Sequence, residues 1–273
     1  MDVNRYVKIL DSMGASASNL MCRSCGLITP SIGQLGICHN CESAISMGRD
    51  MLVKRSPDLV AALDDINAKL YANMYDEALA AYDELIKKDA EPSLVYAEAL
   101  AYSRRSNYEV AQISYDRPGF MEENAEHRGN AARYAATARM LFNKAASQCR
   151  AALAGGESPS SRYTAFMSYV KLGDYKAARA MLGEMADSGN DYVHEYAAMV
   201  FCSATGRFDE MLGHAEELTK PGSFSINAFF YIALALLKNH DKKQALRLLG
   251  ALKKHVDSDA IRALDGEASS DSL

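Results

Sequence analysis

The stretch YVKLGDYKAA at residues 169–178 decides the fold class of this chain. Gly173 suits the left-handed conformation that closes a helix, and Asp174 can cap the start of the next helix. Tyr175 is expected to wedge between the two helices, and the small side chain of Ala178 lets them approach closely. This stretch therefore predicts two helices joined by a tight turn.

The same pattern recurs along the chain at a nearly constant spacing. Small or apolar residues follow one another at steps of 33, 34, 33, 33 and 34 residues, at Ala78, Ala111, Ala145, Ala178, Met211 and Ala245. Three positions before them stand Tyr75, Tyr108, Phe142, Tyr175, Phe208 and Lys242. A period of about 34 residues is typical of an array of helix–turn–helix units.

The unit with Tyr169 before Gly173-Asp174-Tyr175 resembles the tetratricopeptide repeat, and the resemblance covers about residues 60 to 255. It implies an all-α fold, a right-handed superhelical solenoid of about six helix–turn–helix repeats. The unit around Phe142 fits least well, because Arg133 occupies a position that is usually small and buried. A local register slip or a distorted helix is expected there, and Pro118-Gly119 predicts a break before it.

Four cysteines near the N-terminus have the spacing of metal ligands. Cys22 and Cys25 form one CxxC pair, and Cys38 and Cys41 form a second pair after twelve intervening residues. Two such pairs can surround one structural zinc ion as a closed tetrahedron, with no open position for a catalytic water. A rubredoxin-type iron site uses the same ligands, so the sequence leaves zinc and iron open. A disulfide pair or a redox dithiol fits less well.

The segment after Cys41 has the pattern of a helix, so the second pair of cysteines is expected at a helix start. A first CxxC knuckle, a hairpin and a second CxxC knuckle at the start of a helix resemble a treble-clef finger. A zinc ribbon is the alternative. The predicted domains are an N-terminal amphipathic helix at 1–19, a zinc-binding finger at 20–55, a repeat solenoid at 56–257 and a flexible tail at 258–273. The N-terminal helix is expected to pack against the finger or the first repeat.

In tetratricopeptide arrays the first helix of each unit lines a concave groove. The resemblance therefore implies a partner-binding groove formed by Tyr96, Leu100, Arg104, Tyr163, Met167, Lys171, Tyr196, Val200, Phe230, Leu234 and Lys238. Aromatic and aliphatic side chains with a few cations suit an extended or helical peptide with apolar side chains. The alternative is that these rings only shield neighbouring helices from water.

The composition narrows the classes of partner. The formal net charge is −5, from 30 Lys and Arg against 35 Asp and Glu, which argues against sequence-independent binding of nucleic acid. No stretch approaches the roughly 18–20 apolar residues that span a membrane. The first residues lack the basic-then-apolar order of a signal peptide, so a cytoplasmic location is expected.

The sequence contains no Gly-rich phosphate loop, no GxSxG and no HExxH motif, and Cys149 and Cys202 fit small core positions within helices. The leading hypothesis is a non-enzymatic protein–protein interaction adaptor or scaffold that binds a partner peptide. The alternatives are a nucleic-acid-associated zinc-finger protein and a metal- or redox-responsive regulator. Self-association is also left open, because uncapped ends of a solenoid are adhesive.

Overall fold

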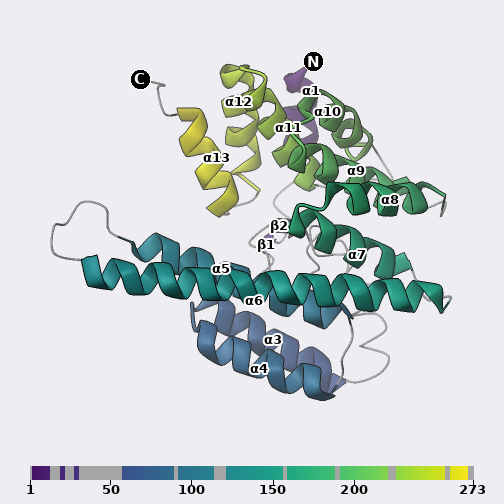
Figure 1. The fold of residues 1–273 in the computed structure, drawn as a ribbon. Helices are drawn as coiled ribbons and strands as arrows, with labels where there is room; N and C mark the ends of the chain where they lie inside the picture. The colour runs from purple at the N-terminus through teal and green to yellow at the C-terminus, as the bar shows by residue number, and fades with distance from the viewer. Residues whose placement is uncertain are drawn as a thin grey trace. The chain divides into compact units, whose positions relative to one another are not determined.

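The computed structural model describes residues 2–12, 19–21, 28–30, 57–88, 92–113, 121–155, 159–187, 191–220, 226–255 and 259–269. These residues form helices and one two-stranded sheet (Figure 1): α1 (Val3–Ser12), β1 (Asn19–Met21), β2 (Ile28–Pro30), α3 (Pro57–Tyr71), α4 (Tyr75–Lys88), α5 (Pro92–Gln112), α6 (Met121–Ala154), α7 (Pro159–Leu172), α8 (Tyr175–Ala186), α9 (Asp191–Ala204), α10 (Phe208–Glu217), α11 (Ile226–Lys238), α12 (Lys242–Leu252) and α13 (Asp259–Ser269). The predicted helical class is confirmed for this part of the chain. The predicted finger's cysteines, Cys22, Cys25, Cys38 and Cys41, lie outside the described residues.

The chain divides into two compact units. Unit 1 contains residues 1–46 together with residues 178–273, and unit 2 contains residues 47–177. The boundary at Ala178 falls inside α8. The repeat region predicted at 56–257 therefore contributes to both units, and each unit is described by itself below.

Four joints between the described helices share one geometry. Each places a residue with positive φ after its first helix: 58° at Asn73, 74° at Gly173, 73° at Gly206 and 63° at His240. The N–H of the next residue donates to the carbonyl five positions earlier, over 2.9 Å at Met74, 2.9 Å at Asp174, 2.8 Å at Arg207 and 2.8 Å at Asp241. This is the Schellman closure of a helix end, and it confirms the turn that the sequence predicts at Gly173.

Side-chain caps begin two of the helices that follow these turns. The Asp174 carboxylate accepts a hydrogen bond from the Ala177 N–H over 3.0 Å. The Asp241 carboxylate accepts one from the Gln244 N–H over 3.3 Å. Each cap satisfies an N–H that has no partner within its own helix. The predicted capping role of Asp174 is thereby confirmed.

Two of the predicted turns do not form, which corrects the repeat pattern in unit 2. Tyr108 and Ala111 lie inside α5, and Phe142 and Ala145 lie inside α6, and each of these helices is continuous. Arg133 is exposed on α6, in line with the slip of register predicted around it. In place of two short helix pairs, unit 2 has one hairpin of long helices (Figure 1).

The reason for the missing turns is local. The residue five positions before each small or apolar residue of the repeat takes the left-handed conformation where a turn forms, and there it is Asn, Gly or His. The equivalent residues in α5 and α6 are Ser106 and Met140, which enter that conformation less readily. No proline lies near either position, so nothing stops the helix and it continues.

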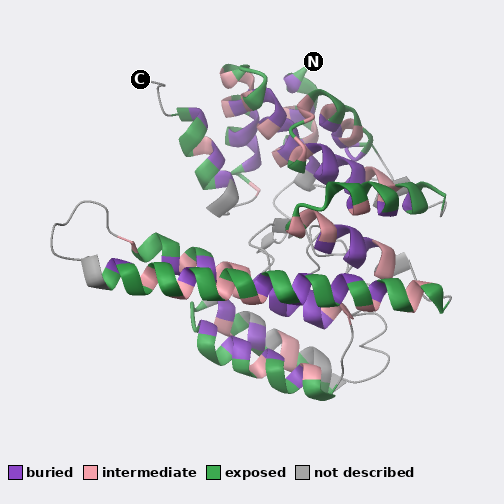
Figure 2. Cartoon of the chain, viewed as in Figure 1, coloured by how far each residue is buried: buried purple, intermediate pink, exposed green. Residues whose placement is uncertain are grey.

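The small anchor residues identify the packed faces of the helices. Ala78, Ala145, Ala178, Met211 and Ala245 are all 0% exposed. Ala111 is exposed because it lies at the end of the continuous α5. Figure 2 shows buried residues along one side of α6 and exposed residues along the other. The predicted period therefore marks the core-facing stripe at five of its six positions, including Ala145 in the continuous α6.

The predicted wedging role of Tyr175 is wrong. Tyr75 is buried at the start of α4, but Tyr175, at the equivalent start of α8, is 40% exposed. Tyr75 packs against Tyr108, with ring centroids 5.4 Å apart, because α5 brings that second ring alongside. The buried anchor of α8 is Ala178 instead.

In unit 1, the last helix corrects the tail predicted at 258–273. Residues 259–269 form α13, which buries Ile261, Leu264 and Ala268 and packs on α11 and α12. These three residues recur at steps of 3 and 4, the spacing of a helical stripe. The segment is polar overall, and its few apolar residues suffice to dock it.

The N-terminal helix α1 also packs on the C-terminal helices. It buries Val3, Tyr6 and Leu10 and lies against α12, whereas the sequence predicts packing against the finger, most of which lies outside the described residues, or against the first repeat. The strands β1 and β2 pair antiparallel, with Met21 opposite Ile28, and β2 lies against α11. The strands therefore bring together the two ends of the segment that contains Cys22 and Cys25.

Candidate functional site

A pocket of about 430 Å³ opens in unit 2 where α5, α6 and α7 meet. Its lining comes from three helices: Ser103, Ser106 and Asn107 of α5, Ala135, Ala136, Ala138, Arg139 and Phe142 of α6, and Lys171 and Leu172 of α7. Lys171 is one of the groove residues that the resemblance predicts. A volume of this size accommodates a few side chains of a peptide or a small ligand.

The pocket follows from the unequal lengths of the helices around it. The α6 helix has 34 residues, whereas α7 has 14 and ends at Leu172. Figure 1 shows α6 running well past the stretch that α7 covers. Three alanines of α6 line the uncovered part, and their small side chains leave the space open. The missing turn at Met140 thus creates the pocket, because α6 continues where a repeat would have ended.

The charges among the described lining residues are all positive. Arg139 and Lys171 both line the pocket and both are exposed, and none of the described residues that line it is acidic. The Ser106 hydroxyl donates to the Ala131 carbonyl over 2.8 Å and is thereby occupied by α6. The remaining polar groups, those of Ser103 and Asn107, can bind a ligand. This combination suits a carboxylate or another anionic group.

Most of the groove residues predicted in unit 2 lie within the packing of the helices. Tyr96, Leu100, Tyr163 and Met167 are buried. The Tyr96 ring lies against Phe142, with centroids 5.5 Å apart, and the Tyr163 ring against Phe166, at 5.9 Å. Arg104 is half-buried, and Lys171 alone of this set is exposed.

In unit 1, Tyr196 and Val200 are likewise buried, and Phe230 and Leu234 are half-buried. Lys238 is exposed and pairs with Glu267 of α13 over 2.5 Å. The predicted groove residues therefore fall in both units. A peptide groove built from all of them stays a prediction.

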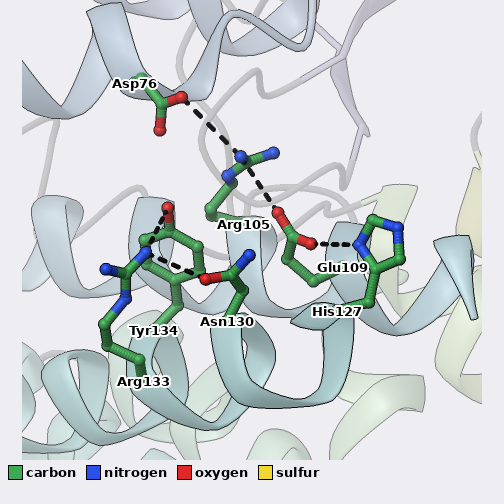
Figure 3. Close-up of polar contacts among 7 residues, drawn as sticks. All are labelled: Asp76, Arg105, Glu109, His127, Asn130, Arg133 and Tyr134. Atoms are coloured by element: carbon green, nitrogen blue, oxygen red, sulfur yellow. Dashed lines mark hydrogen bonds and ion pairs between the residues drawn. The ribbon is translucent and has the colours of Figure 1, made fainter. Parts of the chain in front are cut away.

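A second polar cluster, which the sequence analysis missed, joins α4, α5 and α6 (Figure 3). The Arg105 guanidinium lies 3.0 Å from Glu109 Oε1 and 3.7 Å from Asp76 Oδ2. The other carboxylate oxygen of Glu109 lies 2.7 Å from His127 Nδ1. Arg105 also faces the rings of Tyr75, Tyr108 and Tyr134, at 5.6, 5.4 and 5.3 Å.

The contacts of this cluster hold α4, α5 and α6 together. Glu109 is 3% exposed, and its carboxylate has a cationic or hydrogen-bonding partner on each oxygen, so its burial is compensated. The signal for it in the sequence is the spacing of Arg105 and Glu109, four residues apart on one helix face. That signal was hidden because the predicted turn placed these two residues on different helices.

A carboxyl pair lies at the contact between α4 and α5. Glu98 of α5 is 4% exposed. Burial, then a hydrogen bond with Asp83 of α4 and the Asp83 charge, raise the pKa of Glu98 to about 7, against a smaller opposing effect of Lys144. Glu98 therefore changes protonation near neutral pH, and the effect falls on the packing of α4 against α5.

The two cysteines outside the predicted finger are core residues, as the sequence predicts. Cys149 and Cys202 are both buried. Burial raises the pKa of the Cys202 thiol, although the Arg207 guanidinium donates to its sulfur over 3.2 Å and opposes the change. A buried thiol with a raised pKa is a poor nucleophile.

Among the described residues, no group of three or more His, Cys, Asp or Glu side chains is placed to hold a metal ion. The metal site predicted at Cys22, Cys25, Cys38 and Cys41 lies outside them. No described helix is both long and apolar enough to cross a bilayer.

No family model matches this chain, and no curated protein matches it. Solved structures resemble it at low identity. A tetratricopeptide repeat protein from Parabacteroides merdae shares 13% identity over 85% of this chain and 100% of its own, at a TM-score of 0.42. YrrB, a TPR protein with an unusual peptide-binding site, shares 17% identity over 81% of this chain and 96% of its own, at a TM-score of 0.35. The TPR2AB-domain:pHSP90 complex of yeast Sti1 shares 17% identity over 78% of this chain and 98% of the matched chain, at a TM-score of 0.34. With TM-scores below 0.5, none of these likenesses assigns a partner to this chain.

Proposed function

We propose that this chain is a non-enzymatic adaptor that binds an acidic segment of a protein partner at the α5–α6–α7 pocket. The observation that supports it is the lining of that pocket, in which Arg139 and Lys171 have no acidic residue beside them among the residues that the structure describes. The chain as a whole carries a net charge of −5, so a cationic pocket stands out against its surroundings. An acidic partner would be attracted to this pocket and repelled by much of the remaining surface.

The partner segment that the sequence analysis predicts has apolar side chains, and the burial of the aromatic rings argues for a different one. Tyr96, Tyr163 and Tyr196 are already buried in the packing of the helices, each at most 2% exposed. An apolar peptide could reach them only by opening the core. Beside its apolar residues, the pocket of unit 2 offers a ligand two cations and neutral polar groups, and the proposed segment is acidic for that reason.

The proposed function includes a structural metal finger at residues 20–55, with one zinc ion held by Cys22, Cys25, Cys38 and Cys41. Iron remains the alternative metal. The pairing of β1 with β2 on either side of the first CxxC supports this proposal, since a knuckle needs both of its ends held together. A cytoplasmic location, where thiols stay reduced, suits four cysteines used as ligands.

The pocket is tested by charge reversal. The double variant Arg139→Glu/Lys171→Glu reverses both cations, and both residues are exposed, so folding should be preserved. The measurement is quantitative mass spectrometry of partners cross-linked in cells. The control Lys88→Glu/Arg128→Glu makes the same change of charge at exposed positions away from the pocket. The proposal expects partners to be lost from the pocket variant only, and equal loss or retention in both variants would contradict it.

The finger is tested separately by metal content. Protein purified without added metal is expected to carry about one zinc ion per chain. The variant Cys22→Ser/Cys38→Ser removes one ligand from each pair and should lose the metal. Iron in place of zinc would favour a redox-responsive regulator. A metal-free protein with oxidised cysteines would contradict the finger.

A further inference from the structure

The pocket between α5, α6 and α7 brings two cations from different helices into one cavity. Arg139 belongs to α6 and Lys171 to α7, and both side chains are exposed to a ligand there. Within the part of the chain that the structure describes, neither side chain has an ion-pair or hydrogen-bond partner. Two like charges in one pocket repel each other, and an anion bound between them relieves that repulsion.

Two neutral side chains of α5 add hydrogen-bond donors to the same pocket. Ser103 is half-buried and Asn107 is exposed, and their spacing of four residues places them on one face of the helix. A hydroxyl and an amide can each donate to an oxygen, a guanidinium carries five N–H donors, and an ammonium carries three. Donors from three helices therefore converge on one cavity, which suits a group with several acceptor oxygens.

The stretch of chain that carries both pocket cations is basic. Residues 127–173 contain seven Lys or Arg and a single acidic residue, in a chain whose net charge is −5. The neighbouring cations of α6 are engaged elsewhere. The Arg133 guanidinium lies 4.9 Å from the centre of the Tyr134 ring and donates to its hydroxyl (Figure 3), and the charge of Lys144 acts on the buried Glu98. The pocket therefore presents its two cations to one ligand group.

The charge of that group distinguishes a phosphate from a carboxylate. A phosphorylated Ser or Thr side chain carries about −1.5 to −2 at pH 7 and presents three strong acceptor oxygens, whereas a carboxylate carries one charge. One phosphate can match both cations and still accept hydrogen bonds from α5. A run of acidic residues would place its further charges against a chain that is itself acidic. The volume of about 430 Å³ is large enough for a phosphorylated side chain.

We propose that the group bound at this pocket is a phosphorylated serine or threonine side chain of the partner segment. The inference rests on the proposed function, because it names the chemistry that the α5–α6–α7 pocket recognises. Arg139 binds phosphate oxygens through its guanidinium fork, and Lys171 neutralises the second charge. Ser103 and Asn107 donate to the remaining oxygens. Phosphorylation of the partner then controls its binding to this chain.

The experiment measures how the full-length protein retains three synthetic peptide pools. Each pool has a fixed central residue, which is phosphoserine, serine or glutamate, and flanking positions of mixed composition without cysteine. Mass spectrometry measures the fraction of each pool that the immobilised chain retains. The wild type should retain the phosphoserine pool at least about tenfold more than either other pool, because that pool alone carries two charges on one group.

Two variants locate this preference and separate it from a general attraction of anions. Arg139→Glu/Lys171→Glu should lose the excess of phosphoserine peptides, and the control Lys88→Glu/Arg128→Glu should keep it. Ser103→Ala/Asn107→Ala keeps both cations and should lower the preference for phosphoserine over glutamate at least about fivefold, through its lost hydrogen bonds to a charged group.

The outcomes distinguish this inference from the proposed function on which it rests. Equal retention of the phosphoserine and glutamate pools, both above serine, would overturn the phosphate and leave the acidic segment standing. Equal retention of all three pools would contradict both. An excess of phosphoserine peptides that survives Arg139→Glu/Lys171→Glu would place the phosphate site outside this pocket and overturn the inference.

A second measurement distinguishes a phosphorylated segment from free phosphate. Inorganic phosphate at the concentration of the peptides should leave the phosphoserine pool bound, because the residues beside phosphoserine also pack on the apolar lining at Phe142 and Leu172. Complete displacement would assign the pocket to free phosphate and overturn the partner segment. In lysate treated with a phosphatase, the partners that depend on Arg139 and Lys171 should be lost. Partners that survive this treatment would contradict the phosphate.

Discussion

Gly206 and Gly213 have opposite conformational requirements although they lie in the same helix pair of unit 1. Gly206 closes α9 with a φ of 73°, whereas Gly213 lies inside α10. A Cβ at either position would meet nothing within 4 Å, so space does not distinguish them. Gly206→Ala should lower the free energy of unfolding by about 1–2 kcal/mol, through its left-handed backbone. Gly213→Ala should raise it by about 0.5–1 kcal/mol, since alanine favours the helix.

Urea denaturation of the two variants beside the wild type measures this difference. The two substitutions add the same methyl group and serve as controls for each other. Changes of the same sign in both variants would refute the left-handed closure at Gly206. By the same reasoning, Gly173→Ala should behave as Gly206→Ala does, because its φ is 74°.

Glu98 should make stability depend on pH near neutrality. Its pKa is raised from 4.5 to about 7, mainly by burial, so the folded state keeps a proton that the unfolded state releases. The stabilisation is complete below pH 4.5 and is lost as the pH rises through 7. This loss amounts to about 3 kcal/mol at 1.36 kcal/mol per pKa unit. Glu98→Gln keeps the shape, removes the charge, and should be more stable than the wild type at pH 8.

The measurement is chemical denaturation of both proteins at pH 5 and pH 8. The control is Glu77→Gln, which removes an exposed carboxylate from α4. The difference between wild type and Glu98→Gln should grow with pH, and the difference for the control should stay near zero. Parallel pH profiles for wild type and Glu98→Gln would contradict a raised pKa of Glu98.

At the scale of elements, one residue position separates the joints that the sequence predicts correctly from those it does not. The position five before each small or apolar residue of the repeat holds Asn73, Gly173, Gly206 or His240 where a turn forms. It holds Ser106 or Met140 where α5 and α6 continue. The period of 33 or 34 residues indicates which face of a helix is packed, and in the continuous α6 it does so at Ala145 without a turn. The period alone therefore overestimates the number of turns, and the closing residue supplies the missing information.

The continuous helix α6 also explains how much of the candidate pocket could be predicted from the sequence. Lys171 was identified because it lies near the end of α7, a helix whose closure at Gly173 is readable in the sequence. Arg139 was missed because it belongs to a stretch that was expected to approach a turn. The alanines beside it become a pocket lining only when α6 runs past the end of α7. That outcome depends on the relative lengths of three helices, which no local pattern encodes.

The Arg105 cluster should fix the packing of α4, α5 and α6 in unit 2. Arg105→Met should lower the free energy of unfolding by about 3 kcal/mol, because it leaves the buried Glu109 carboxylate without its cation. Arg105→Met/Glu109→Met removes both charges and should be the more stable of the two variants, by about 1–2 kcal/mol. A double-mutant cycle in urea measures this coupling. A single variant that costs less than the double variant would show that Glu109 does not depend on Arg105.

At the scale of the whole molecule, the compact units do not follow the order of the sequence. Unit 1 joins residues 1–46 to residues 178–273, whereas the predicted domains run consecutively from one end to the other. Tyr6 lies against Glu216 and Phe229, and such distant contacts leave no periodic signal. The amphipathic stripe of α1 was readable, since a local pattern creates it. The surface against which α1 packs could not be predicted, because any apolar surface of the chain can pack against the same stripe.

The C-terminal helix α13 should protect the end of unit 1 from self-association. Its buried residues Ile261, Leu264 and Ala268 cover α11 and α12, the role that a capping element has in a repeat array. A chain ending at residue 258 exposes the apolar surface beneath them, and should bind a hydrophobic dye and form larger species in size exclusion. A chain ending at residue 269 keeps α13 and should match the full-length protein. Monomeric behaviour of the shorter chain, with unchanged stability, would mean that the covered surface does not need α13.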